Sequence, residues 1–391
     1  MTPLARLLAC AALVTGLATA CGSGSVPVAH RSPEPVRTPV PGVPVHATTA
    51  RIPPLLDPRD VYAADRPGRL SAEALLAKPL VYVPDDDNAR VVVIDPRTYQ
   101  VLRTEKVGRL PQHVTPSYDL RTLWVDNDQG NSLTPIDPRT GRFGTPVPVT
   151  DPYNLYFTAD GSRAVVVAER LRRLDFRDPR TMRLQHSLHV PCKGVDHADF
   201  SRDGTHALFS CEFSGQLLWV DMVHEKVLRT IDLPRQTAAR PMPQDVKTSP
   251  DGSTFYVADQ TSNGVFEIDA TTLRVRRFLT TGHGAHGLYV SRDSKDLYVT
   301  NRYGGSVSVL SFATGKVRAT WPLPGGSPDM GGVSADGKVL WLSGRYDGEV
   351  YAIRVSDGHL LARIHVGGQP HGLCVWPQPG RYSLGHTGVL R

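Results

Sequence analysis

Histidine and acidic side chains recur at fixed distances from a repeated turn sequence, and these residues could do chemistry. The turn resembles Ser-x-Asp-Gly and recurs every 41 to 48 residues, with its first position at Ser117, Thr158, Ser201, Ser249, Ser291, Ser334 and Trp376. Each copy has a polar side chain four or five residues earlier. These positions include His113, Asp196, His197, Asp245, His286, Asp329 and His371. Imidazoles and carboxylates together can bind Zn, Cu, Ni or Fe, or can hydrogen-bond a polar ligand.

Two arginines follow matching strands in neighbouring repeats. They lie in Asn301-Arg302-Tyr303-Gly304 and in Gly344-Arg345-Tyr346-Asp347. A guanidinium can bind a carboxylate or a phosphate through two parallel hydrogen bonds. We therefore expect Arg302 and Arg345 to reach the same place as the histidines and to bind an anionic group there.

The repeat also predicts the elements that position these residues. Each copy has one apolar strand before the turn, one after it and two more separated by polar turns. Four short strands at this period are typical of a β-propeller blade, so seven copies predict an all-β, seven-bladed propeller. Strands 81–107 lack a first strand, and strand 371–376 has no strands after it. We expect these two parts of the chain to pair and complete one antiparallel blade.

In such a propeller, the loops at one rim bring the polar positions of all blades to the mouth of the central channel. Three interpretations of this mouth stay open. Its polar residues could only cap strands and bind water, or they could bind a small molecule or a protein partner. They could also hold a metal or haem-like redox cofactor through His113, His197, His286 and His371. However, four imidazoles on alternate blades could lie too far apart to share one ion.

The sequence 297–301, Leu-Tyr-Val-Thr-Asn, and the looser copies at 256–259 and 124–127 resemble the YVTN-type β-propeller family. The turns at 249–252 and 334–337 fit as well, and the resemblance covers about residues 80–376. The whole layout is similar to the exported YncE-like proteins of bacteria. Similar propellers include haem d1 and copper domains of redox enzymes and a lactonase family. The resemblance therefore implies the fold and does not imply one activity.

The residues before the propeller predict export and tethering. Residues 1–21 combine an apolar run with small residues, which is typical of a signal peptide. Cys21 follows directly and resembles a lipoprotein box, so we expect a lipid anchor there, with ordinary secretory cleavage as the alternative. Residues 22–54 predict a disordered, Pro-rich tether. Residues 55–78 predict a surface segment with a short helix, and 79–391 the propeller, with 381–391 as a tail on its far side.

Cysteines are few, and two of them fall in one blade. Export makes a disulfide between Cys192 and Cys211 possible, although strand register places them slightly out of opposition. The net charge of +6 comes from scattered Lys and Arg. This pattern favours a solvated surface over a nucleic-acid site.

Taken together, these features predict an exported binding or scaffold module. We expect a monomer that meets the membrane only through its lipid anchor and binds an unidentified protein or small molecule. No nucleophile elbow or phosphate-binding loop is present, so we expect no catalytic residues and no cofactor, and a lactonase-like hydrolase is the lowest alternative. The predicted binding residues are His113, Asp196, His197, Asp245, His286, Arg302, Asp329, Arg345 and His371.

Overall fold

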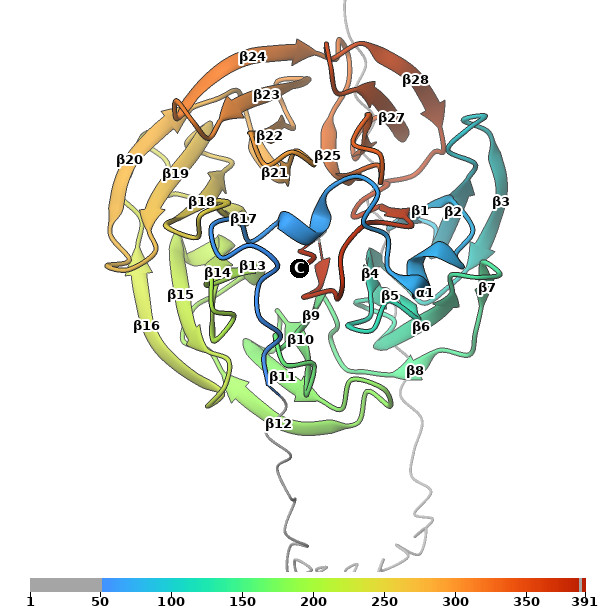
Figure 1. The fold of residues 1–391 in the computed structure, drawn as a ribbon, viewed down its shortest axis with the longest axis horizontal. Coiled ribbons are helices and arrows are strands. Elements are labelled where there is room, and N and C mark those ends of the chain that lie inside the picture. The colour runs from blue at the N-terminus through green and yellow to red at the C-terminus, as the bar shows by residue number, and fades with distance from the viewer. Residues whose placement is uncertain (1–50, 387–388) are drawn as a thin grey trace, which may run out of the picture. The chain divides into compact units, whose positions relative to one another are not determined.

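The computed structural model describes residues 51–386 and 389–391. The predicted signal peptide, Cys21 and the predicted tether up to residue 50 lie outside the described residues. Seven antiparallel sheets surround a central channel, so the prediction of an all-β, seven-bladed propeller is confirmed (Figure 1). No helix in the described part of the chain is long and apolar enough to cross a lipid bilayer.

Each blade has its first strand at the channel and its fourth strand at the outer edge. From the channel outwards, the first blade consists of β29 (Cys374–Trp376), β1 (Leu80–Asp85), β2 (Arg90–Ile94) and β3 (Val101–Lys106). The second blade consists of β4 (Pro111–Pro116), β5 (Leu123–Asn127), β6 (Ser132–Asp137), β7 (Arg142–Phe143) and β8 (Val147–Pro148). The third blade consists of β9 (Asn154–Phe157), β10 (Ala164–Ala168), β11 (Arg173–Arg177) and β12 (Leu184–His189). The outer strand of the second blade is broken into β7 and β8, where Pro146 and Pro148 cannot donate to a sheet.

The other four blades follow the chain in order. The fourth blade consists of β13 (Val195–Phe200), β14 (His206–Cys211), β15 (Gln216–Asp221) and β16 (Lys226–Asp232), and the fifth of β17 (Pro243–Thr248), β18 (Thr254–Asp259), β19 (Gly264–Asp269) and β20 (Val275–Thr280). The sixth blade consists of β21 (Ala285–Val290), β22 (Asp296–Asn301), β23 (Ser306–Ser311) and β24 (Lys316–Pro322). The seventh consists of β25 (Pro328–Val333), β26 (Val339–Gly344), β27 (Glu349–Arg354) and β28 (Leu360–His365). A 3-10 turn, η2 (Glu212–Ser214), follows β14.

The two ends of the propeller sequence close the ring. β29 pairs with β1 in the register Leu80↔Trp376, Val81↔Val375 and Tyr82↔Cys374. The predicted pairing of a C-terminal first strand with the N-terminal strands is confirmed. This pairing removes the open sheet edges that an incomplete blade would expose.

Hydrophobic side chains fill the spaces between neighbouring blades. The second strands are buried on both faces and read as continuous apolar runs, such as β10. One cluster joins Trp124 and Leu133 of the second blade to Leu155 and Phe157 of the third. Burial of this apolar surface is the main force that holds the blades together.

One end of the channel is covered by the segments that flank the propeller (Figure 1). The N-terminal segment contains η1 (Ala63–Asp65) and the short helix α1 (Ala72–Leu75), which Ser71 caps by accepting a hydrogen bond from Ala74 N. The Tyr62 hydroxyl donates to Thr248 O at 2.8 Å. The C-terminal segment, expected as a simple tail, turns into the channel, and Leu384 O accepts from Phe157 N at 3.0 Å.

A disulfide joins Cys192, in the loop before β13, to Cys211 at the end of β14, with a Cα–Cα distance of 6.0 Å. Cys211 pairs in the sheet with Val195 rather than with Cys192, because Cys192 lies before the strand begins. Cys374 is a buried free thiol. The disulfide therefore ties the loop before β13 to the end of the neighbouring strand β14.

Tyrosine hydroxyls connect first strands of neighbouring blades, and this predicts a measurable stability loss. Tyr156 accepts a hydrogen bond from Ala198 N at 2.8 Å. The variant Tyr156→Phe leaves this buried N–H without a partner, so we expect a loss of about 1–3 kcal/mol in the free energy of unfolding, measured by urea denaturation. Tyr82→Phe is the control, because that buried hydroxyl has no hydrogen-bond partner among the described residues. Equal losses in both variants would contradict this role.

Candidate functional site

The first strands carry β-bulges at the predicted site positions. In five blades the register shifts across two residues, namely Gln112–His113, Asp196–His197, Gln244–Asp245, His286–Gly287 and Asp329–Met330. A bulge inserts an extra residue and redirects the side chains around it. This local geometry explains why the polar residue stands either four or five positions before the repeated turn.

Four of the predicted histidines lie together in the channel. The ring centroids of His113 and His371 are 4.8 Å apart, and those of His113 and His197 are 5.7 Å apart. His286 lies 6.2 Å from His197 and 6.4 Å from His371. Neighbouring rings thus lie close together, but the four imidazoles do not form one group of possible metal ligands: His113 and His197 belong to one such group, and His286 and His371 to another.

Direct backbone contact between first strands explains this closeness. His113 and Gly372 form a parallel β-bridge, in which Gly372 N donates to Gln112 O at 2.9 Å and Val114 N donates to Gly372 O at 3.0 Å. A Cβ atom on Gly372 would lie only 2.0 Å from His113 Cδ2. The glycine is therefore required at this position for the two strands to approach and for the His113 ring to fit.

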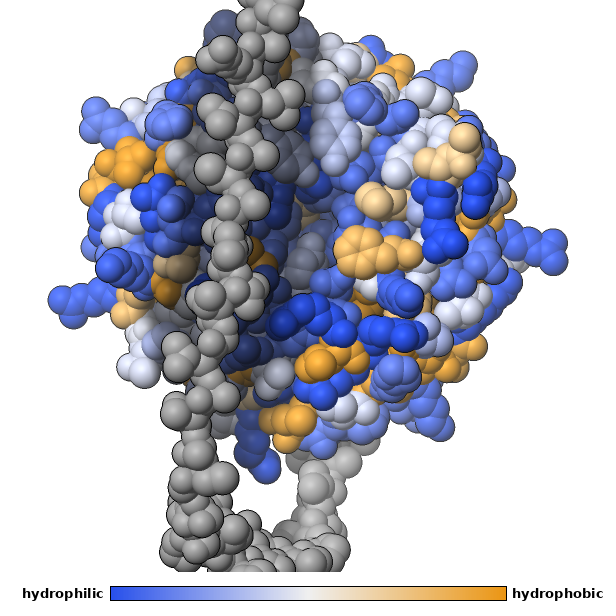
Figure 2. Space-filling model, turned by 180° about the vertical axis from the view of Figure 1, so that it is seen from behind, coloured by the Kyte–Doolittle hydropathy of each residue, from blue (hydrophilic) through white to orange (hydrophobic). Residues whose placement is uncertain are grey.

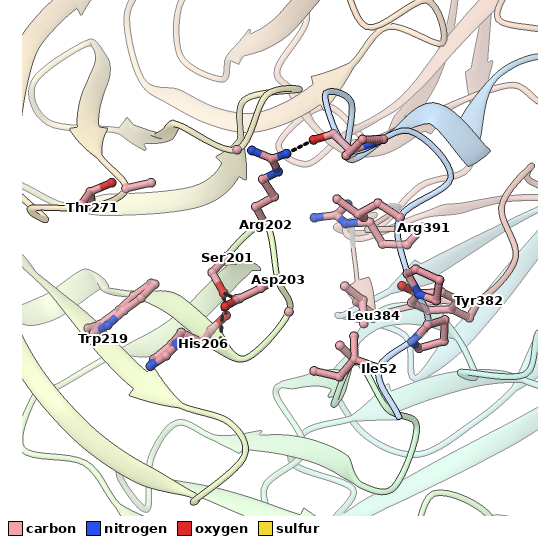
Figure 3. Close-up of a pocket in the computed structure, with 18 residues that line it drawn as sticks. Ile52, Ser201, Arg202, Asp203, His206, Trp219, Thr271, Tyr382, Leu384 and Arg391 are labelled. Atoms are coloured by element: carbon pink, nitrogen blue, oxygen red, sulfur yellow. Dashed lines mark hydrogen bonds between the residues drawn. The ribbon is translucent and has the colours of Figure 1, made fainter. Parts of the chain in front are cut away.

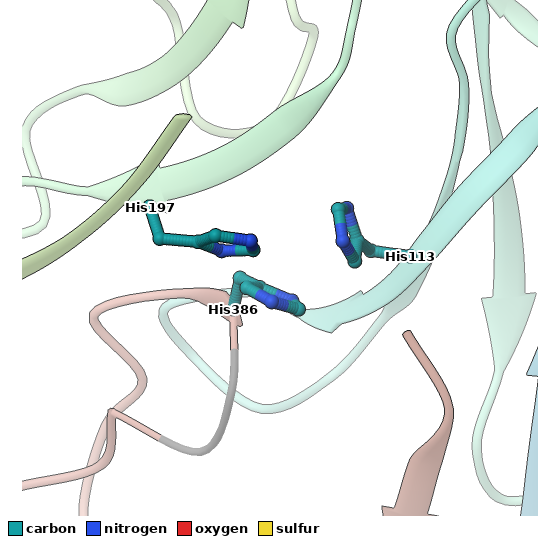
Figure 4. Close-up of side chains that lie close together, drawn as sticks. All are labelled: His113, His197 and His386. Atoms are coloured by element: carbon teal, nitrogen blue, oxygen red, sulfur yellow. The ribbon is translucent and has the colours of Figure 1, made fainter. Parts of the chain in front are cut away.

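A fifth histidine, His386, joins the group and was not predicted. Its ring centroid lies 4.0 Å from that of His113 and 5.0 Å from that of His197 (Figure 4). His386 comes after the last repeat, so the repeat pattern could not include it. The available signal was the apolar character of Tyr382, Leu384, Val389 and Leu390, which is unusual for an exposed tail.

These side chains form two groups whose ligand atoms approach one another closely. His113, His197 and His386 make the first group, which we call the three-histidine group. His286, Asp329 and His371 make the second, which we call the Asp329 group. In each of them, one possible metal-ligand atom per residue lies within 4.8 Å of the others, and all six residues are buried.

The three-histidine group consists of neutral imidazoles. Burial lowers the pKa of His113 to about 3, and it holds the pKa values of His197 and His386 well below their ordinary value. His113 Nδ1 lies 2.8 Å from the Tyr153 carbonyl oxygen, so Nδ1 donates and Nε2 keeps its lone pair. A histidine fixed in this way presents Nε2 to a ligand or metal.

The Asp329 group already contains a cation. Arg302 donates from Nε to Asp329 Oδ1 at 2.8 Å, and its Nη2 contacts His286 Nε2. His286 Nδ1 lies 3.0 Å from Asp329 Oδ1. Burial alone would raise the pKa of Asp329, but the Arg302 guanidinium and the His286 imidazole hold it well below its ordinary value. Asp329 is therefore ionised, and Arg302 compensates its charge.

Arg302 and Arg345 both reach the channel, as predicted, but carboxylates of this chain bind them. Arg345 donates to Asp86 Oδ2 at 2.8 Å, and its Nη1 lies 4.0 Å from Asp329 Oδ2. Their guanidinium charges are thus largely compensated inside the protein. The geometry gives little support to their predicted role as binding sites for an external anion.

The two other predicted aspartates have different surroundings. Asp245 accepts from Val246 N and from Leu288 N, both at 2.9 Å, so it connects two blades. Asp196 accepts from Asn154 Nδ2 at 3.1 Å, while its Oδ2 atom is buried without a hydrogen-bond partner among the described residues. Burial and the nearby Glu212 and Glu169 carboxylates raise the pKa of Asp196 well above its ordinary value.

Further carboxylates lie at the mouth, where the second strands end. Burial and the Glu212 carboxylate raise the pKa of Glu169 to about 7. Burial and the neighbouring Asp151 raise the pKa of Asp128 to about 7 as well. Arg170 is the nearby cation, with Nε 2.7 Å from Asp151 Oδ1. Several carboxyl groups thus share this side of the mouth.

A large open cavity lies elsewhere, on the covered face of the propeller. It has a volume of about 820 Å³ and is lined by residues that include Ile52, Arg202, Trp219 and Tyr382 (Figure 3). None of the predicted site residues lines it. The cavity and the histidine groups are therefore separate features.

Asp329 is expected to dominate the stability of the channel. Asp329→Asn leaves Arg302 and Arg345 buried without their shared anion, so we expect a loss of about 3–5 kcal/mol in the free energy of unfolding. The double variant Asp329→Asn/Arg302→Gln should lose less than the sum of the single variants, because neither charge is then left alone. Urea denaturation measures both effects. Asp232→Asn, at an exposed position, is the control, and additive losses would contradict this pairing.

Comparison with known proteins agrees with this fold. The model of the YNCE-like β-propeller family matches residues 68–379. Kuenenia stuttgartiensis hydrazine synthase superposes with a TM-score of 0.59 at 22% identity, covering 71% of this chain and 96% of the other. A putative 6-phosphogluconolactonase from Bacteroides uniformis gives a TM-score of 0.61 at 16% identity, covering 75% and 98%. Dihydro-heme d1 dehydrogenase NirN, in complex with DHE, gives a TM-score of 0.55 at 14% identity, covering 79% of this chain and 76% of the other.

At these identities the structural neighbours share the fold alone. A comparison with curated proteins gave no match. The family model, in contrast, spans the whole ring from the segment before β1 to the end of β29. This chain belongs to the YncE-like β-propeller family.

Proposed function

We propose that this protein is an exported, lipid-tethered binding module that captures a cationic group at the open end of its channel. The observation that carries the proposal is the difference between the two channel ends. Residues 51–78, 377–386 and 389–391 cover one end, and blade loops form the other. Tyr153, Glu169 and Glu212 remain partly exposed at this second end, which we call the mouth.

The charge that is left uncompensated at the mouth is negative. Asp128, Glu169 and Glu212 follow the second strands of three consecutive blades, and Asp196 lies deeper beside them. The raised pKa values of Glu169 and Asp196 reflect burial first and then mutual repulsion. A bound ammonium or guanidinium group would relieve this repulsion and favour the ionised carboxylates. Arg302 and Arg345 compensate the charge of Glu212 only in part, because Asp329 and Asp86 also hold them.

Two aromatic side chains on the other side of the mouth support the same class of ligand. Tyr303 and Tyr346 stack with ring centroids 5.9 Å apart, and both are about half exposed. The Arg302 guanidinium carbon already lies 5.8 Å from the Tyr346 ring centroid. Tyrosine faces attract cations. The face that carries the mouth is mostly hydrophilic, with apolar groups scattered over it (Figure 2).

Arginine amide, which carries an ammonium and a guanidinium, is a suitable probe of this proposal. We expect it to bind the full chain in the presence of EDTA, and to bind about tenfold more weakly to Glu169→Gln/Glu212→Gln. Binding should strengthen between pH 5 and pH 7, because Glu169 and Asp128, with pKa values of about 7, begin to lose their protons in this range while the α-ammonium of the probe stays mostly charged. Isothermal titration calorimetry measures both effects.

The control for this experiment is Glu105→Gln, which removes a partly exposed carboxylate on the outer strand β3. It should bind the probe as the unmodified protein does. Preferential binding of acetate or phosphate, or equal affinities in the mouth variant and the control, would contradict a cation-binding mouth.

Membrane tethering has its own test. In a bacterial host fed an alkyne-labelled fatty acid, we expect the full-length protein to incorporate the label and to sediment with membranes. Cys21→Ser should lose both properties, because the thiol is the proposed lipidation site. Label retained in Cys21→Ser, or an unlabelled and secreted wild-type protein, would exclude the lipid anchor and favour ordinary cleavage.

A further inference from the structure

We propose that the channel contains a transition-metal site formed by His113, His197 and His386, suited to zinc or copper. The site lies deeper than the mouth carboxylates and does not depend on the cationic ligand proposed above. Its ligands come from two bulged first strands, β4 and β13, and from the C-terminal segment. Figure 4 shows the three rings turned toward a common space.

The spacing of the three imidazoles fits one ion. Their ligand atoms all lie within 4.8 Å of one another. Zinc binds imidazole nitrogens at about 2.0–2.1 Å, which places tetrahedral ligands about 3.4 Å apart. Small rotations of the rings would close the difference. Three histidines leave a fourth coordination position for water or another small ligand, as in zinc sites with three protein ligands.

The chemical state of the histidines also fits a metal. All three are buried and neutral, and neutral imidazole is the form that binds zinc and copper. His113 Nε2 has no hydrogen-bond partner among the described residues, although the side chain is fully buried. A buried lone pair without a partner is costly unless an ion or water occupies the space beside it. The hydrogen bond from His113 Nδ1 to the Tyr153 carbonyl is typical of a metal-bound histidine.

A carboxyl oxygen lies beside this group, whereas the Asp329 group has a fixed cation. Asp196 Oδ1 is 3.2 Å from His197 Nε2. In the Asp329 group, two histidines and one carboxylate would suit iron. However, the Arg302 guanidinium contacts both His286 Nε2 and Asp329 Oδ1 there, and a metal ion would meet its positive charge. The three-histidine group is therefore the better site for a metal ion.

The third ligand is held in place by the segment that closes the channel. Gly385 forms a bridge with Tyr156, and its N–H donates to Ser383 Oγ at 3.0 Å. A Cβ atom on Gly385 would lie 2.5 Å from Leu155 O. The backbone φ of Gly385 is +127°, a conformation that would strain any residue with a side chain at this position. Gly385 thus lets the chain reach the channel wall and present His386. A bound ion would join this C-terminal segment to two blades.

The test uses the full-length chain, freed of metal with EDTA and then titrated separately with Zn²⁺, Cu²⁺ and Mg²⁺. We expect one Zn²⁺ or Cu²⁺ per chain and no Mg²⁺ binding, because imidazole is a poor ligand for Mg²⁺. His113→Ala and His386→Asn should each weaken zinc binding by about 100-fold or more, since removing even a supporting residue costs 10- to 100-fold. Zinc should also raise the melting temperature of the wild-type protein but not of these variants.

Two controls locate the ion. His371→Asn changes the Asp329 group and should keep zinc affinity within about threefold of wild type. His224→Asn removes an exposed histidine and should have no effect. If zinc binding is absent in the wild type, or is unchanged in His113→Ala and His386→Asn, the site is wrong. If zinc binding is lost only in His371→Asn, the ion belongs to the Asp329 group and this assignment is also wrong.

Should both ligand variants fail to fold, X-ray absorption of the zinc-loaded wild-type protein decides. A first shell with three imidazole nitrogens supports the site, and a shell made mainly of oxygen overturns it. The outcome is distinct from that of the mouth experiment. Arginine amide binding is measured in the presence of EDTA, without bound metal. A failure of arginine amide to bind therefore does not affect the zinc titration, and a failure of zinc to bind does not affect the arginine amide measurement.

Discussion

Burial of ionisable side chains is the constraint that the channel must satisfy. Asp329 is ionised and fully buried, and it can be so because Arg302, Arg345, His286 and His371 all lie within 4.0 Å of its carboxylate. Removing this carboxylate would leave two buried guanidinium groups with less compensation, which is among the costliest changes in a protein interior. The imidazoles meet the same constraint differently, since burial keeps them neutral. The channel is therefore a polar core, and every group in it depends on its neighbours.

The propeller architecture supplies these neighbours. Apolar packing between blades fixes the ring, and β29 closes it by pairing with β1. The first strands then meet at the channel, where bulges add a residue at the level of the histidines. The flanking segments complete the structure by covering one end and bringing His386 inside. Sequence-distant residues thus share one small space, although each blade contributes only one or two of them.

Much of this could be predicted from the sequence, because the repeat encodes it. A distance of four or five residues from the turn sequence places His113, His197, His286 and His371 near one level of the channel, and the incomplete repeats at the two ends predict the closure. The distances between the imidazoles could not be predicted, since they depend on bulges and on the His113–Gly372 bridge, which have no signature in the period. The carboxylates that pair with Arg302 and Arg345 include residues of other blades. The sequence distance between each arginine and such a partner therefore does not predict the pairing. His386 follows the last repeat, so the repeat pattern could not predict its position.

We infer that the channel is a binding site whose deepest part binds a metal ion. Anomalous diffraction at the zinc absorption edge, from crystals soaked in dilute Zn²⁺, tests it most directly. We expect one strong anomalous peak at about 2.0–2.1 Å from a ring nitrogen of each of His113, His197 and His386. A map without a peak in the channel, or with its channel peak beside Asp329, would contradict it.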